Sequence, residues 1–164
     1  MFRLRSLIAV AAVSAAVVSA PACGPGADVS TAIQVLEVSS GWYDAGIVNG
    51  QNKLVPSVTF KLKNISDRPV TTLQANVLFH RVNSPEEWGS GFLRVAGSEG
   101  LQAGATSDML TVKSDLGYTG TETRADMLKN SQFVDAKVRI LAKAGSNYWH
   151  PLGEFPIERR LFVP

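Results

Sequence analysis

The sequence predicts an all-β fold, a sandwich of two antiparallel sheets. After residue 30, apolar and polar residues alternate with period two through most of the chain, the pattern of strands with one buried face. Glycine, proline, asparagine and aspartate separate these segments at spacings that suit turns. Only residues 123–130 carry the start and stop signals of a helix. These observations favour two packed layers of antiparallel strands.

Two strands are predicted before residue 50. Ile33 to Val38 is the first, and Trp42 to Val48 is the second. The Asn49-Gly50 pair that follows favours a two-residue hairpin turn, because both residue types tolerate positive φ.

The clearest alternation begins at Val58. One strand runs from Val58 to Lys63, and Asn64 to Pro69 has the composition of a turn. A second strand lies within Thr71 to Val82 and places Leu73, Ala75, Val77 and Phe79 on one face. We expect these two strands to be antiparallel neighbours joined by a short loop.

Three later strands and one helix complete the predicted domain. The strands are Ser107 to Lys113, Phe133 to Lys143 and Tyr148 to Glu158, and prolines in the last one indicate an edge strand. Thr123 is a capping residue for a helix of one or two turns, which we expect to cover one end of the core.

The segment Val58 to Val70, followed by Leu73 to Phe79, resembles the FxLYD-type domains of bacterial exported proteins. Those domains have a strand, an Asn-x-Ser/Thr turn, and a second strand that ends in an aromatic residue. His80 and Arg81 depart from the usual ending of that strand. The resemblance implies an immunoglobulin-like sandwich and supplies no catalytic residues. Together with the strand and helix patterns, it leads us to expect about seven strands and one short helix.

The N-terminal segment has the features of an export signal. Arg3 and Arg5 precede an apolar run from Leu7 to Val18, and small residues follow up to Cys23. We therefore expect residues 1–22 to be a signal peptide, residues 23–30 a flexible tether and residues 31–164 a single β-sandwich domain. The sixteen residues from Leu7 to Ala22 fall short of the ~20 that a membrane-spanning helix needs.

Cys23 is the candidate lipidation site. Ala20-Pro21-Ala22-Cys23 resembles the lipobox of bacterial lipoproteins, although Ala20 stands where leucine is usual. A lone cysteine has no partner for a disulfide within the chain. The resemblance to lipoproteins, with Gly24 rather than aspartate after the cysteine, implies an outer-membrane lipoprotein that faces the periplasm. The alternative is a soluble periplasmic or secreted protein without lipid.

Charge and motifs exclude several functions. Without residues 1–22 the chain keeps its 14 acidic residues, and its basic residues fall from 16 to 14, so it is formally neutral. This argues against nucleic-acid binding, which needs clustered Lys and Arg. There is no Gly-x-Ser-x-Gly motif and no phosphate-binding loop, and the two histidines are not in a metal-binding pattern. We expect no catalytic residue, no cofactor and no metal.

The three tryptophans are the remaining candidates for contact with a ligand or partner. Trp42, Trp88 and Trp149 each lie beside turn-forming residues, and Trp88 belongs to a predicted long loop from Asn83 to Ala105. Exposed tryptophans stack on sugars or anchor protein partners, whereas buried ones close the ends of a sandwich. The sequence thus favours a non-catalytic envelope module that binds a protein partner or has a structural role in an assembly, with glycan binding through these tryptophan-bearing loops as the alternative.

Overall fold

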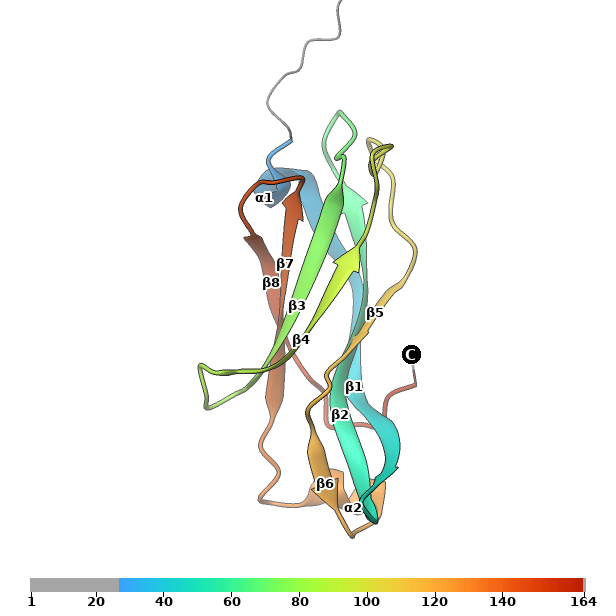
Figure 1. The fold of residues 1–164 in the computed structure, drawn as a ribbon, viewed down its shortest axis with the longest axis vertical. Coiled ribbons are helices and arrows are strands. Elements are labelled where there is room, and N and C mark those ends of the chain that lie inside the picture. Colours follow the sequence, from blue (N-terminus) through green and yellow to red (C-terminus); the bar gives the residue numbers. More distant parts are fainter. Residues whose placement is uncertain (1–26, 164) are drawn as a thin grey trace, which may run out of the picture.

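The computed structural model describes residues 27–163, so the predicted signal peptide and Cys23 lie outside the described residues. Two antiparallel sheets pack face to face (Figure 1). The first sheet contains β1 (Ile33–Val48), β2 (Gln51–Asn64), β5 (Leu110–Lys113) and β6 (Tyr118–Gly120), with both β5 and β6 paired to β2. The second sheet has the order β4 (Glu87–Arg94), β3 (Leu73–Arg81), β7 (Ala136–Ala144) and β8 (His150–Pro156). This confirms the predicted all-β sandwich.

The core lies between the sheets and follows the predicted alternation. Val58, Phe60 and Leu62 of β2 have no exposed surface, and they face the second sheet. The inward residues of β3 and β7 are equally buried: Leu73, Ala75, Val77, Phe79, Val138, Ile140 and Ala142. Each fully buried large apolar side chain contributes about 1.5–3 kcal/mol, so these three strands supply much of the stability.

The two strands predicted before residue 50 form one long strand, β1. Its register with β2 shifts between Leu36 and Ser39 and again between Asp44 and Ile47. These irregularities interrupt the period-two pattern without ending the strand. The predicted hairpin turn is confirmed, because Asn49 and Gly50 have φ angles of 51° and 78° and Val48 pairs with Gln51.

The strands predicted at Val58 to Lys63 and within Thr71 to Val82 are part of β2 and β3. The prediction that they are neighbours is wrong, because β2 and β3 belong to different sheets. The turn between them crosses from one layer to the other and is organised by Asn64, which is fully buried. The Asn64 side-chain amide donates to the carbonyl oxygens of Arg68 and Leu101, each at 2.8 Å. Its Oδ1 accepts from the Ser66 backbone N–H at 3.0 Å and from the Ser66 hydroxyl at 2.7 Å.

Two helices cap opposite ends of the sandwich (Figure 1). At one end lies α1 (Val29–Ala32), whose Val29 and Ala32 are buried, and Ala27 before it is buried as well. The packed part of the chain therefore begins inside the segment predicted as a tether, residues 23–30. At the other end lies the predicted helix, α2 (Arg124–Lys129), capped by the Thr123 hydroxyl, which accepts from the Asp126 N–H.

Candidate functional site

Trp42 and Trp88 lie inside the molecule, at the end of the sandwich near α2. Trp42 has no exposed surface and Trp88 is 8% exposed. The Trp42 ring lies 6.0 Å from Trp88, 5.6 Å from Tyr118 and 4.6 Å from Phe133, centroid to centroid. The hypothesis that Trp42 and Trp88 are exposed contact surfaces is therefore wrong. Both are buried and close the end of the core, which was the alternative.

Trp149 is the tryptophan that reaches the surface. It immediately precedes β8, yet its ring lies 6.3 Å from that of Phe92 on β4, at the opposite edge of the second sheet. The two rings meet edge to face, at 89°. The Lys143 ammonium lies 4.9 Å from the centre of the Trp149 ring. Trp149 thus lies across the outside of the second sheet.

This outer surface of the second sheet, here named the outer β3 face, has an apolar centre. Strand register places Phe92, Asn76 and Leu141 in one cross-strand row, and Ser90, Leu78 and Arg139 in the next row. Phe92 is 60% exposed, and Leu78 and Leu141 are half-buried. Apolar side chains on the solvent side of a two-layer sandwich are available for contact with another molecule.

Cations surround this apolar centre. Arg94 and Lys143 occupy the row beyond Phe92, while Arg139 and Lys137 lie on the other side of Leu141. Glu154 of β8 accepts from Lys137 at 3.1 Å and from Arg139 at 3.2 Å. These hydrogen bonds, first the one from Lys137, hold the pKa of the Glu154 carboxyl below its ordinary value. The face therefore carries more positive than negative charge.

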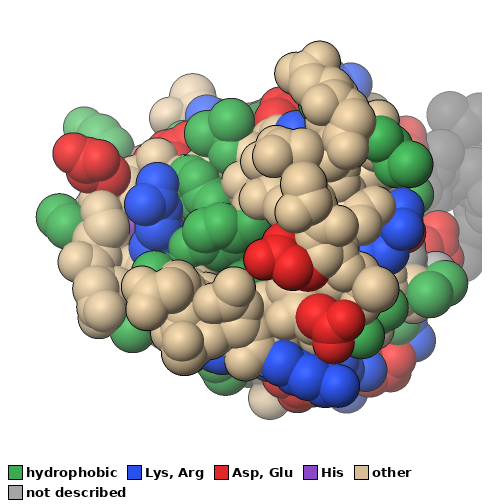
Figure 2. Space-filling view, turned by 90° about the horizontal axis from the view of Figure 1, so that it is seen from below, with side chains coloured by type: hydrophobic (Ala, Val, Ile, Leu, Met, Phe, Trp, Pro, Cys, Tyr) green, Lys and Arg blue, Asp and Glu red, His purple; other side chains and the backbone are tan. Residues whose placement is uncertain are grey.

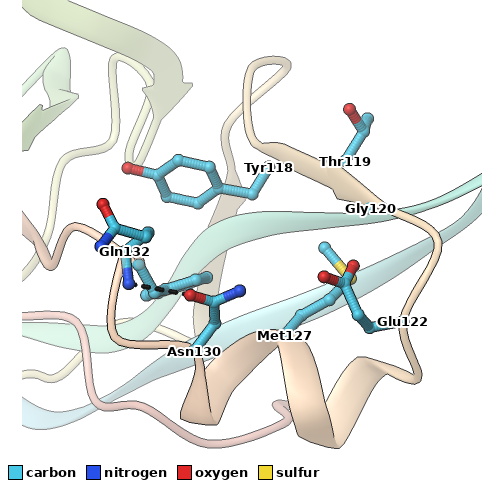
Figure 3. A pocket seen from close by; sticks show the side chains of 8 residues that line it. Tyr118, Thr119, Gly120, Glu122, Met127, Asn130 and Gln132 are labelled. Atoms are coloured by element: carbon cyan, nitrogen blue, oxygen red, sulfur yellow. Dashed lines mark hydrogen bonds between the residues drawn. The ribbon is translucent and has the colours of Figure 1, made fainter.

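A small pocket, here named the end pocket, opens beside the buried aromatic cluster. It has a volume of about 170 Å³ and lies between β6, α2 and the segment after α2. Its lining residues are Tyr118, Thr119, Gly120, Glu122, Met127, Asn130, Gln132 and Phe133. Figure 3 shows Tyr118, Gln132, Asn130, Met127 and Glu122 around the open space, with Thr119 pointing away. In the view from this end, hydrophobic side chains reach the surface between basic and acidic groups (Figure 2).

The walls of the end pocket are fixed by contacts with the sheets. The Asn52 amide donates to the Glu122 carbonyl oxygen at 2.7 Å, and Arg124 forms an ion pair with Asp44 of β1. The Tyr118 hydroxyl donates to the Val134 carbonyl oxygen at 3.3 Å. Burial raises the pKa of Tyr118 above its ordinary value, so the hydroxyl stays protonated at neutral pH. These contacts preform the pocket.

Nothing in the described part of the chain gathers metal ligands. Within residues 27–163 there is no group of three or more His, Cys, Asp or Glu that could hold a metal ion. His80 pairs with Lys137 and His150 pairs with Ala142, so the two histidines lie at different levels of the second sheet. Across the same residues, no helix has the length and hydrophobicity to span a bilayer.

The sequence did not point to the outer β3 face or to the end pocket. The predicted loop from Asn83 to Ala105 includes Phe92, which the structure places on β4. Leu78 and Leu141 lie on the outward faces of β3 and β7, where alternation predicts polar residues. Gly117 immediately precedes β6, and a Cβ there would collide with the Leu54 carbonyl oxygen, so glycine allows Tyr118 to pair with Leu54 of β2.

Comparison with protein-family models gives no match, and comparison with curated proteins gives none either. Among solved structures, the chain is similar to the one described as "X-ray structure of Northeast Structural Genomics Consortium target SoR45". The two are 13% identical, with a TM-score of 0.46, over 79% of this chain and 89% of that chain. At this degree of similarity, the likeness supports no conclusion about fold or function.

Proposed function

We propose that this protein is a non-catalytic cell-envelope lipoprotein whose β-sandwich binds another envelope protein through the outer β3 face. The observation that carries the proposal is the placement of Phe92, 60% exposed, against Trp149 in the middle of a sheet surface. An outward sheet face that contacts only water is usually polar. Here its centre is aromatic and aliphatic, as in the buried centres of protein–protein interfaces.

The chemistry of the face specifies the partner. Aromatic residues and arginine are enriched at interface centres. Phe92 and Trp149 meet here, and Arg139 lies in the neighbouring cross-strand row, beside Leu78. The cations Arg94, Lys143 and Lys137 surround that centre, and Glu154 compensates only part of their charge. A complementary partner surface presents an apolar patch surrounded by carboxylates, which would steer association and fix its register.

The envelope location rests on the N-terminal sequence. Arg3, Arg5 and the apolar run before Cys23 support export, and the resemblance of residues 58–79 to FxLYD-type domains supports the same compartment. We propose that Cys23 carries the lipid and that the protein resides in the outer membrane, facing the periplasm.

The mass of the native N-terminal peptide tests the anchor. We expect a peptide that begins at Cys23 and carries the added mass of a diacylglycerol, because the preceding residues form a signal. An unmodified Cys23 at the N-terminus would leave a soluble exported protein and would contradict the anchor. A peptide that retains Met1 would contradict export itself.

Site-specific photo-crosslinking in intact envelopes tests the partner. A crosslinker at position 92 is expected to capture one envelope protein, whereas one at Ile65, which is 55% exposed and off this face, is not. Arg94→Glu is expected to reduce the yield from position 92 by roughly threefold or more, because it reverses one of the cations that steer association. High salt is expected to reduce it too, because rim charges are screened.

The matched control for Arg94→Glu is Lys129→Glu, which reverses an exposed cation at the other end of the molecule. Equal losses in the two variants would show a general charge effect and contradict a role for the outer β3 face. Equal capture from positions 92 and 65 would also contradict it.

A further inference from the structure

We infer that the end pocket is a binding site for a single sugar ring, such as a terminal or branching residue of an envelope glycan. This site is separate from the outer β3 face, and it involves neither Trp149 nor Phe92. Its walls come from β6, α2 and the segment that follows α2, at the end of the sandwich opposite α1.

The size of the pocket limits its ligand. Pockets that enclose drug-sized molecules measure about 300–1,000 Å³. The end pocket measures about 170 Å³ and is open on one side, as Figure 3 shows. It therefore admits one ring, with the remainder of the molecule outside.

The floor of the pocket is apolar and aromatic. Met127 and Phe133 are buried, and the Tyr118 ring lies 4.7 Å from that of Phe133, centroid to centroid. The Arg159 guanidinium lies 5.3 Å from the centre of the Phe133 ring and forms an ion pair with Asp135. Because Arg159 lies over the Phe133 ring, that ring is already in contact with a cation. The half-buried Tyr118 ring is therefore the aromatic surface that remains for a ligand.

The rim of the pocket carries hydrogen-bonding groups that the fold does not use. Among residues 27–163, the side chains of Glu122 and Gln132 form no hydrogen bond or ion pair with any described group. The Asn130 Oδ1 accepts from the Gln132 N–H at 2.8 Å, which leaves its NH₂ group available. The rim therefore offers a carboxylate and two amides, that is, several acceptors and several donors.

This combination distinguishes a sugar from an aromatic side chain. An aromatic ring would cover Tyr118 and Met127 but would displace water from Glu122 and Gln132 without replacing their hydrogen bonds, which is costly. A pyranose presents C–H groups on one face and hydroxyls around its edge. The former match the Tyr118 ring, and the latter match the carboxylate and the amides.

Saturation-transfer NMR on the full chain tests the inference, with the methyl glycosides of glucose, galactose, mannose and N-acetylglucosamine as probes. We expect transfer to the ring protons of at least one glycoside. Gln132→Ala and Glu122→Ala are expected to weaken its binding at least about fivefold each, the effect of losing one hydrogen bond. Both side chains are exposed, so neither change disturbs the core.

Gln34→Ala, at an exposed glutamine of β1, is the matched control and should leave binding unchanged. Absence of transfer from all four glycosides would overturn the inference. So would transfer that survives both rim variants. Binding of p-cresol without binding of any glycoside would show that the pocket receives an aromatic side chain instead.

Discussion

Replacing Trp42 with alanine is expected to lower the free energy of unfolding by about 3–5 kcal/mol, the range for large aromatic side chains in a core. Trp42 has no exposed surface, and its ring contacts Trp88, Tyr118 and Phe133. The substitution removes a ring that contacts all three of the others and leaves a cavity among them. Urea unfolding followed by far-UV circular dichroism measures the loss.

Trp149→Ala is the matched comparison, because it removes the same side chain from a half-exposed position on the outer β3 face. We expect it to cost much less, since the site remains open to water and leaves no cavity. A loss for Trp42→Ala that does not exceed the loss for Trp149→Ala would contradict the arrangement of the aromatic cluster.

Asn64→Ala is expected to cost about 3 kcal/mol, because buried polar groups would lose their partners. The Asn64 side chain donates to the Arg68 and Leu101 carbonyl oxygens and accepts from the Ser66 N–H. Asn64→Asp is expected to be at least as damaging, since a carboxylate cannot donate and would face the two carbonyl oxygens. Thermal and urea unfolding measure both variants.

Asp67→Asn changes an exposed residue in the same turn and is the control for position 64. It is expected to alter stability by no more than about 0.5 kcal/mol, as for most surface substitutions. If Asn64→Ala lowered the free energy of unfolding no more than Asp67→Asn does, the turn that links β2 to β3 would not depend on the Asn64 hydrogen bonds.

Periodicity alone was sufficient for the strands whose inward positions carry large side chains. In β3, the inward Leu73, Val77 and Phe79 alternate with outward residues that are polar except for Leu78, and the structure buries all three completely. The same pattern could not assign strands to sheets, because a buried face does not identify its neighbouring strand. The pairing of β2 and β3 was therefore predicted wrongly, while their existence and their faces were predicted correctly.

Strand β4 escaped prediction for a physical reason. Two of its inward positions are Gly89 and Gly91, which give no hydrophobic signal. A Cβ at Gly89 would collide with the Ser114 hydroxyl, and a Cβ at Gly91 would collide with the Val112 side chain. Glycine is required there because the two sheets approach closely, so the packing itself removes the alternation by which a strand is recognised.

The candidate surfaces were harder to predict because each is assembled from distant segments. Phe92 and Trp149 belong to opposite edges of the second sheet and meet only when it folds. The position of each tryptophan beside turn-forming residues makes it a candidate in the sequence, but only the fold shows that Trp42 is inside and Trp149 is at the surface.

The packed chain begins at Ala27, and if Cys23 carries a lipid, this early start limits the distance between the domain and the membrane. Four peptide units join Cys23 to Ala27, and they reach at most about 14 Å when fully extended. A lipid on Cys23 would therefore keep the α1 end close to the bilayer surface. The α2 end would point away from the bilayer. The second sheet would then face sideways, toward proteins anchored in the same membrane.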